Sequence, residues 1–263
     1  MDVDWKSTVN SFSLTKQVVS VKNLNKHSIL DLIRFTPGGI SRVELARRMD
    51  LSRAAVTTIV NDLLETQVIR EAERINLHSV RPPIVLEINP TRGCVVGIDL
   101  GATHISLLLA DLSSRILEET ETPLDIRQGP VNCLDLADQL LGQLLAKAGF
   151  GFPDILAVGL GVPGPIVSEA GTVISPPIMP GWDGFPIRDT LEKRWGCPVS
   201  VNNDAELGAL GEWASGAARG EHNLAYIKVG TGIGAGLLID GQIYRGITGS
   251  AGEIGHLTID ENG

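Results

Sequence analysis

The placement of glycine constrains this chain most strongly. Of its 30 glycines, only Gly38 and Gly39 precede residue 91, and the other 28 follow it. Charge divides at the same point, because residues 1–90 carry 12 Lys and Arg against 10 Asp and Glu, whereas residues 91–263 carry 10 against 21. Halves that differ this much indicate two domains. We expect a leader over residues 1–24, a small helical domain over 25–90 and a glycine-rich α/β domain over 91–263.

The overall composition excludes several classes of protein. A net charge of -9 argues against a protein that coats nucleic acid without specificity, which needs a cationic face. No apolar run approaches the length of a membrane span, and the first residues do not resemble a secretory signal. Cys94, Cys133 and Cys197 are odd in number and far apart, so we interpret them as buried thiols of a cytoplasmic protein rather than a disulfide framework.

The first domain has the pattern of a helix-turn-helix. Apolar spacing predicts helices over Asn25–Phe35, Arg42–Met49 and Arg53 to about Thr66, and Ser41 and Ser52 are placed to cap the second and third. A short turn between a short helix and a longer one is typical of this motif. The inner faces are expected to hold Ile29, Leu32, Ile33, Val43, Leu45, Ala46, Val56, Ile59, Val60, Leu63 and Leu64.

The start of the third predicted helix suits the major groove of DNA. Small and hydroxylated residues with one arginine can meet phosphates and base edges there. Two strands after Val68, joined by a basic tip, would form a wing, and the segment LSRAAVTTIVNDLLETQVI resembles winged-helix domains of the MarR-like type. A three-helix packing module without a DNA role is the alternative. The expected contacts to a double-stranded DNA operator are Ser41, Ser52, Arg53, Ala54, Ala55, Thr57, Thr58 and Arg81.

The second domain begins with a strand and a glycine turn that could hold phosphate. Asp99, Gly101 and Thr103 form an Asp-x-Gly-x-Thr turn between two predicted strands, where amides can approach phosphate oxygens and the carboxylate can hold Mg²⁺ through water. An ordinary β-hairpin is the alternative. A second glycine-rich turn, Gly230-Thr231-Gly232, follows another predicted strand and would suit the outer phosphates of a nucleotide.

Two further predicted strands end at places where a ligand could bind. The apolar run Ile155–Gly161 leads into a rigid Pro-Gly-Pro loop, at the end of a strand where α/β folds usually bind ligands. Asp204 follows Asn203 at a strand-to-helix junction, where it could be a helix cap or a general base that deprotonates a substrate hydroxyl. The loop from Gly171 to Pro186 contains Trp182, which we expect to help to wall a pocket.

Five spaced motifs carry a family resemblance. GIDLGAT, GLGVPGPI, NNDAELGALGE, KVGTGIGAGLLIDGQIYRG and AGEIGH resemble the ROK family of repressors and sugar kinases over residues 91–263. The resemblance implies an actin-like, ribonuclease H-like sugar-kinase fold with a sugar in its cleft. Together with the winged helix it implies a sugar-responsive regulator similar to xylose and N-acetylglucosamine repressors. By matched position, the implied sugar-binding residues are Asn203, Asp204, Glu253 and His256, and the implied phosphate-binding residues are Asp99, Gly101, Thr103, Gly230, Thr231 and Gly232.

Three residues depart from the kinase pattern of this family. Ala102 stands where a second glycine is common, His104 replaces a usual lysine, and Glu206 adds a negative charge beside Asp204. Each weakens the case for phosphoryl transfer, so we expect a sugar-responsive repressor rather than an enzyme. The alternative is an ATP- and Mg-dependent sugar kinase with Asp204 as its base, and a non-functional remnant is a third possibility.

The C-terminal end bears on metal binding. The family resemblance implies a cysteine cluster shortly after AGEIGH, which with His256 would hold a structural zinc, and the printed sequence contains no such cluster. We therefore expect an incomplete second lobe, with His256 as a lone zinc-ligand candidate. The remaining expectations are a homodimer or higher homo-oligomer, a small sugar effector and no membrane partner.

Overall fold

The computed structural model describes residues 21–73, 84–167, 170–174, 176, 178–247, 249–258 and 260. These residues form two compact units, each taken here by itself. The first contains the described chain up to Cys94 together with Ala110–Arg115. The second contains Val95–Leu109 and the described chain from Ile116 onward. No helix in the described part of the chain has both the length and the apolar character that a membrane span requires.

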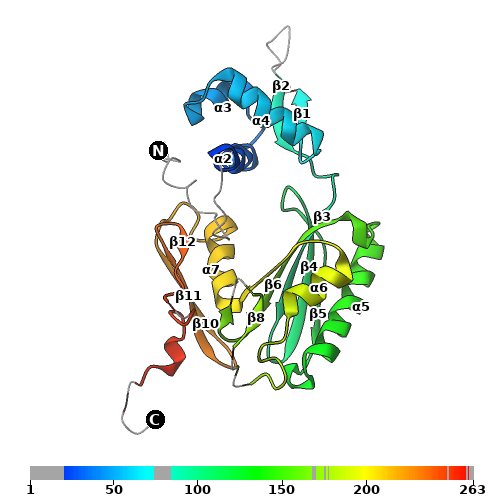
Figure 1. Cartoon of the computed structure of the whole chain (residues 1–263), viewed down its shortest axis with the longest axis vertical. Helices are drawn as coiled ribbons and strands as arrows, with labels where there is room; N and C mark the ends of the chain where they lie inside the picture. Colours follow the sequence, from blue (N-terminus) through cyan, green and yellow to red (C-terminus); the bar gives the residue numbers. More distant parts are fainter. Residues whose placement is uncertain are drawn as a thin grey trace. The chain divides into compact units, whose positions relative to one another are not determined.

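The described part of the N-terminal unit has three helices followed by two paired strands, and this order confirms the predicted winged helix-turn-helix (Figure 1). Its first described helix starts four residues before the predicted Asn25, inside the expected leader. The strands pair antiparallel from Ile69 with Ile88 to Glu73 with Ile84. The expected wing tip, including Arg74, His78 and Arg81, lies outside the described residues. The elements are α2 (Val21–Phe35), α3 (Arg42–Met49), α4 (Arg53–Glu65), β1 (Ile69–Glu73) and β2 (Ile84–Ile88).

Apolar side chains from all three helices form the core of this unit. Most of the predicted inner faces are buried, and Leu64 is partly buried against them. Val43 is an exception, because its side chain is 57% exposed. It lies two positions before the buried Leu45, which places it about 200° around the helix axis and therefore on the opposite face.

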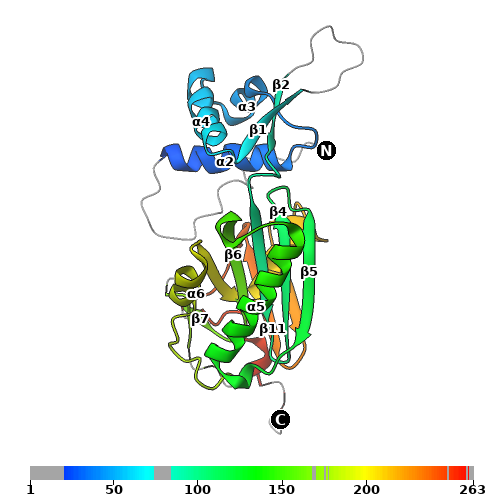
Figure 2. The ribbon, with the colours of Figure 1, turned by 90° about the vertical axis from the view of Figure 1, so that its right-hand side faces the viewer.

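The second unit is built on a five-stranded sheet in the order β5-β4-β3-β6-β9. β6 and β9 are parallel, so their carboxyl ends reach the same edge of the sheet. Figures 1 and 2 show α5 and α6 along one side of this sheet, with α7 on the other. The elements to this point are β3 (Cys94–Leu100), β4 (His104–Asp111), β5 (Ile116–Pro123), α5 (Pro130–Ala148), β6 (Ile155–Val162), β7 (Ile166–Val167), β8 (Thr172–Val173), α6 (Ile187–Trp195), β9 (Val199–Asn203) and α7 (Asp204–Ser215).

A three-stranded antiparallel sheet lies on the other side of α7. It contains β10 (Leu224–Val229), β11 (Ile233–Ile239) and β12 (Gln242–Ile243). Two glycines allow the close packing of α7 on this sheet, because a Cβ at Gly236 would meet the carbonyl oxygen of Ala205 and one at Gly208 would meet the ring of Tyr226. Glycine at these positions is therefore explained by packing rather than by ligand binding.

The far face of the three-stranded sheet is apolar and open. Tyr226 contacts α7, so the alternate residues of β10 point away from that helix. Ile227 and Val229 are both exposed there.

Candidate functional site

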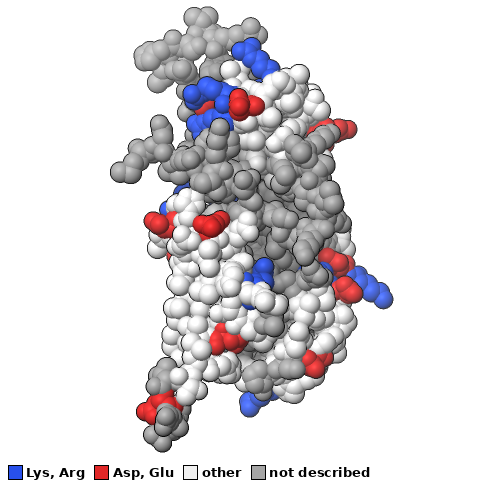
Figure 3. All heavy atoms as spheres, turned by 60° about the vertical axis from the view of Figure 1, so that its left-hand side comes forward, with Lys and Arg blue, Asp and Glu red and all other residues white. Residues whose placement is uncertain are grey.

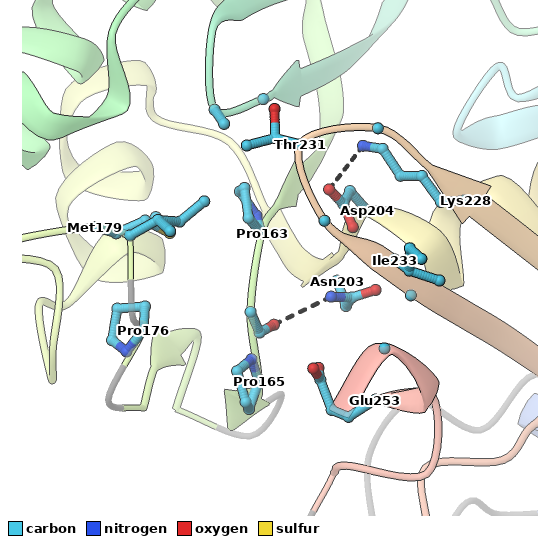
Figure 4. Close-up of a pocket in the computed structure, with 18 of the residues that line it drawn as sticks. Pro163, Pro165, Pro176, Met179, Asn203, Asp204, Lys228, Thr231, Ile233 and Glu253 are labelled. Carbon is cyan, nitrogen blue, oxygen red and sulfur yellow. Dashed lines mark hydrogen bonds and ion pairs between the residues drawn. The ribbon is translucent and has the colours of Figure 1, made fainter. Parts of the chain in front are cut away.

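A cavity of about 900 Å³ lies where the loops of the five-stranded sheet face β10 and β11. Nine of the ten residues predicted to bind sugar or phosphate line it, among them Asn203, Asp204, Thr231 and Glu253 (Figure 4), and the tenth, Asp99, lies 3.5 Å from the lining residue His104. The cavity is lined by Gly101, Ala102, Thr103, His104, Pro163, Gly164, Pro165, Pro176, Ile178, Met179, Asn203, Asp204, Lys228, Gly230, Thr231, Gly232, Ile233, Gly234, Ser250, Glu253, Gly255 and His256.

Asn203, at the end of β9, is the cap of α7. Its side-chain oxygen accepts the N–H groups of Ala205 and Glu206, at 2.9 and 3.3 Å, and its amide group donates to the carbonyl of Gly164 at 3.1 Å. These bonds satisfy the start of the helix and fix the loop after β6. The capping role that the sequence offered for Asp204 therefore belongs to its neighbour, and the Asp204 carboxylate is left to face the cavity.

The Asp204 carboxylate is held by a lysine that the sequence reasoning missed. Lys228 Nζ lies 2.7 Å from Asp204 Oδ2, and the N–H of Ala205 donates to Asp204 Oδ1 at 2.7 Å (Figure 4). Burial acts to lower the pKa of Lys228, but the hydrogen bond and charge of Asp204, with the charge of Asp99, raise that pKa above its usual value. Lys228 is therefore a fixed cation in the cleft. Its signal in the sequence is a charged residue between apolar ones, two positions before the first glycine of a glycine-rich turn.

The first predicted phosphate motif follows β3 and is partly covered by a histidine. The His104 ring lies where a Cβ on Gly101 would stand, and His104 Nε2 is 3.5 Å from Asp99 Oδ2. Asp99 Oδ1 is buried without a hydrogen-bond partner in the described part of the chain. The substitution of histidine for the usual lysine thus places a ring against the turn whose amides were expected to approach phosphate.

The second predicted phosphate motif forms the turn between β10 and β11. The N–H of Gly230 donates to the carbonyl of Gly232 at 2.9 Å and closes the turn. A Cβ at either glycine would have no heavy atom within 4 Å, so both positions face open space. This turn keeps the room that a ligand would need for close approach to the backbone.

Glu253 and His256 are carried by a segment that lies directly on β11. The N–H of Ala235 donates to the carbonyl of Gly252 at 2.7 Å, and a Cβ at Gly252 or Gly255 would collide with β11 backbone oxygens. The Glu253 side chain is largely buried at the cavity, whereas that of His256 is 75% exposed, with Nε2 3.7 Å from Glu253 Oε2. The glycines of this motif therefore bring the glutamate to the cleft.

The charge of Glu206 has a partner that the sequence reasoning missed. Arg245 Nη2 lies 2.9 Å from Glu206 Oε2, and the same nitrogen donates to Asn202 Oδ1 at 3.2 Å. Burial raises the pKa of Glu206, and the charge and hydrogen bond of Arg245 act in the opposite direction. The expected extra negative charge beside Asp204 is therefore countered within the fold by Arg245.

Trp182 does not wall the cavity, contrary to the expectation. Its side chain is fully buried, and its indole N–H donates to the carbonyl of Ile126 at 3.2 Å. The same loop nevertheless reaches the cavity through Pro176, Ile178 and Met179. The Trp182 side chain therefore belongs to the hydrophobic core, and smaller side chains of the same loop form the wall of the cavity.

The described residues do not fit a zinc site. They contain no group of three or more His, Cys, Asp or Glu side chains that could hold a metal ion. Cys94, Cys133 and Cys197 are buried, and burial raises the pKa of the Cys133 thiol to about 11. Among the residues that the structure describes, His256 thus lacks the partners that a tetrahedral zinc needs.

In the N-terminal unit, the start of α4 presents an exposed polar face. Ser52 caps the helix by accepting the N–H of Ala55 at 3.2 Å, and Arg53, Thr57 and Thr58 are exposed. Ala54 is exposed and Ala55 is partly exposed. Figure 3 shows basic side chains gathered on this unit, at the top of the view, with acidic ones among them.

Ser41 serves the helix before it. Its oxygen accepts the N–H of Glu44 at 3.2 Å, which confirms it as the cap of α3. The carboxylate of Glu44 accepts hydrogen bonds from Arg47 and Arg48, and these bonds lower the pKa of Glu44 to about 2. Arg81 lies outside the described residues.

Comparisons with known proteins cover both units. The model of the ROK family matches residues 95–263, and a model described as winged helix-turn-helix DNA-binding matches residues 22–70. The xylose repressor of Caldicellulosiruptor bescii is 33% identical over 91% of this chain and 60% of its own length. The glucokinase of Halalkalibacterium halodurans is 36% identical over 64% of this chain and 51% of its own length.

A solved structure extends the likeness to the fold. The crystal structure of a ROK family transcriptional regulator, a homologue of the E. coli MLC protein, superposes with a TM-score of 0.78 and 26% identity, over 92% of this chain and 61% of that one. The chain spans about 60% of the length of the xylose repressors that it matches. The order of the motifs, the fold and the match to the family model together show that this chain belongs to the ROK family and carries a winged helix-turn-helix before its ROK domain.

Proposed function

We propose that the chain is the DNA-reading and sugar-sensing part of a transcriptional repressor of carbohydrate-utilisation genes, working in the cytoplasm. One observation carries this proposal: a single chain joins the exposed polar start of α4 to a ROK cleft that gathers Asp204 and Glu253. The xylose repressors support it, because they match over nine-tenths of the chain, whereas the glucokinase matches 64% of it. A binding unit and a sensing unit in one chain are what a ligand-controlled repressor requires.

The proposed roles follow from the groups that each site offers. Arg53, Thr57 and Thr58 contact an operator in the major groove, with Ser52 and the helix start near phosphate. Two copies of the chain bind the two half-sites of the operator, so the active species is a homodimer. Asp204 and Glu253 accept hydrogen bonds from sugar hydroxyls, and His256 contributes at the rim of the cleft.

The proposal is tested by retardation of a labelled operator fragment from a sugar-utilisation promoter. Arg53→Ala is expected to lose about 1–3 kcal/mol of binding free energy, as removal of a base-reading arginine does. Arg127→Ala is the matched control, because Arg127 is an exposed arginine of the other unit. Equal retardation by wild type and Arg53→Ala would contradict the assignment of α4 to the groove, and failure of any sugar to change retardation would contradict the sensing role.

A sugar kinase is the second candidate, favoured by the open glycine turn at Gly230 and Gly232 and by Asp99 Oδ1, which has no hydrogen-bond partner among the residues that the structure describes. In that case the two turns would hold ATP phosphates, Asp99 would hold Mg²⁺ through water, and Asp204 would be the base. The His104 ring against Gly101 and the Lys228 ammonium on Asp204 both oppose it. An assay coupled to ADP release over a hexose panel decides between the two, because turnover that Asp204→Asn abolishes would favour the kinase.

A further inference from the structure

A fixed cation touches the carboxylate at which a sugar hydroxyl is expected. Lys228 is the only lysine or arginine among the described residues that line the cavity. Its position follows from β10, where it shares the parity of Tyr226 and therefore points to the side of the sheet that carries α7 and the cleft. Tyr226 packs on α7, whereas Lys228 lies farther along the strand, level with the first residue of α7, which is Asp204.

The pair leaves hydrogen-bonding capacity for a ligand. An ammonium has three donors, and one is directed at Asp204 Oδ2. Each oxygen of Asp204 already accepts one bond, from Lys228 or from the N–H of Ala205, and retains a second lone pair. A hydroxyl is both a donor and an acceptor, so it can donate a hydrogen bond to the carboxylate and accept one from the ammonium at the same time.

The charges around the cavity disfavour an anionic ligand. Lys228 faces Asp204 directly and feels the charge of Asp99, so its single positive charge is already balanced. Glu253 adds a further carboxylate, which Figure 4 shows well apart from the pair. A phosphate or carboxylate on the ligand would enter a cleft in which acidic side chains outnumber the one fixed cation.

From these contacts we propose that Lys228 is a specificity-determining residue that, together with Asp204, binds a hydroxyl of an uncharged sugar. This inference rests on the proposed sensing of sugar by the cleft. Because Lys228 holds Asp204 Oδ2, the carboxylate serves to recognise the ligand. The opposite charges of the two side chains balance each other, so the cleft selects neutral sugars over phosphorylated or acidic ones. Neither the motif match nor the order of the motifs assigns a role to this lysine.

The test compares neutral and anionic sugars on the wild-type chain by calorimetry at pH 8, above the ordinary pKa of histidine. The probes are xylose, glucose, N-acetylglucosamine, glucuronate and glucose 6-phosphate, of which glucuronate and glucose 6-phosphate share the ring of glucose. We expect at least one neutral sugar to bind, and both anionic probes to bind at least tenfold more weakly. Tighter binding of an anionic probe would overturn the inference while leaving sugar sensing intact.

Variants test the lysine itself. Lys228→Met is expected to weaken binding of the neutral sugar about tenfold or more, as loss of a charged hydrogen bond does. Lys193→Met is the matched control, because Lys193 is exposed on α6, and it should bind as wild type does. Binding by Lys228→Met at the wild-type affinity would overturn the inference.

A change of preference separates recognition from a structural role. Asp204→Asn frees Lys228 from its partner and removes one negative charge from the cleft. The ratio of glucuronate to glucose affinity should then rise at least tenfold, which a loss of folding would not produce. An unchanged ratio would contradict the charge balance, and binding of none of the five probes to the wild-type chain would overturn both the inference and the proposed sugar sensing. Operator retardation, measured separately, reports on the DNA-binding part of the proposal.

Discussion

At the scale of single residues, two neighbouring polar groups in this chain have different tasks, because one builds the local structure and the other faces the cavity. Asn203 uses both ends of its amide to cap α7 and to hold the loop at Gly164. Asp204, one residue later, places a carboxylate oxygen on Lys228 in the cavity. Loss of sugar binding on substitution of Asn203 would therefore report a displaced helix start, whereas the same loss at Asp204 would report a lost contact.

Trp182 permits a prediction that separates core from pocket. Trp182→Phe removes the hydrogen bond to Ile126 and should lower the free energy of unfolding by about 1–2 kcal/mol, and Trp182→Ala should lower it by about 3–5 kcal/mol because it leaves a cavity. Sugar affinity of Trp182→Phe should stay within about twofold of wild type, since Trp182 does not line the cleft. Urea unfolding and calorimetry give the two numbers. A large loss of sugar affinity in a well-folded Trp182→Phe variant would contradict this prediction and would show that Trp182 contributes to the wall of the cavity.

The limits of sequence reasoning at this scale have physical causes. The junction of a strand and a helix drew attention to Asp204, whereas Glu253 was predicted from the family resemblance of the AGEIGH motif. Lys228 escaped notice, because a lysine in a strand is ordinarily solvated and alternation alone does not say which face borders a cleft. Trp182 was misplaced because an aromatic residue in a proline-rich loop suits a pocket wall and a buried plug equally well.

At the scale of elements, α7 is the structural centre of the second unit. It packs between the five-stranded sheet and the sheet of β10 and β11, and its start carries Asp204. The apolar run Ile155–Gly161 predicted β6 and missed its last residue, Val162. This run was informative because a strand that is covered on both faces has a continuous apolar sequence. α6 was not predicted, since its nine residues follow a proline-rich loop and bury only Ile187, Leu191 and Trp195.

The ion pair of Glu206 on α7 and Arg245 after β12 provides a prediction about this element. Arg245→Met leaves Glu206 buried without its counter-charge and should lower the free energy of unfolding by about 1–3 kcal/mol, a figure reduced because Arg245 is partly exposed. Adding Glu206→Gln should restore at least half of the loss, as a double-mutant cycle in urea would reveal. The exposed pair of Arg127 with Asp125 is the control, and Arg127→Met should leave stability unchanged. Strict additivity of the Glu206 and Arg245 effects would contradict the coupling.

At the scale of the whole molecule, the division seen in composition follows two compact units with different surfaces. The N-terminal unit is closed around its own core, whereas the second unit leaves apolar side chains of β10 and β11 exposed. The change in glycine content predicts a boundary near residue 90, and the first compact unit runs to Cys94 and also includes Ala110–Arg115. Charge alone did not single out the exposed start of α4, because acidic and basic side chains are mixed on that unit.

The open apolar face should govern self-association. Contiguous exposed apolar side chains favour contact between molecules, so the mass of the chain measured by sedimentation should rise with concentration. Replacing both Ile227 and Val229 by Thr, which suits an exposed strand, should reduce that rise without lowering the melting temperature. Ile116→Thr, at an exposed isoleucine of β5, is the control and should change neither. An undiminished rise in the double variant would exclude this face as the contact.

The alternation of β10 has a consequence for how this protein can vary. Along one short strand, Tyr226 supports α7, Lys228 reaches the cleft, and Ile227 and Val229 point to the opposite side. Many single substitutions would alter one of these tasks and spare the others. Loss or gain of one residue within the strand would exchange all of them at once, and would place an isoleucine or a valine where Asp204 now finds its counter-charge. Natural variation in this strand should therefore proceed by replacement, and length changes should be confined to the turns at its ends.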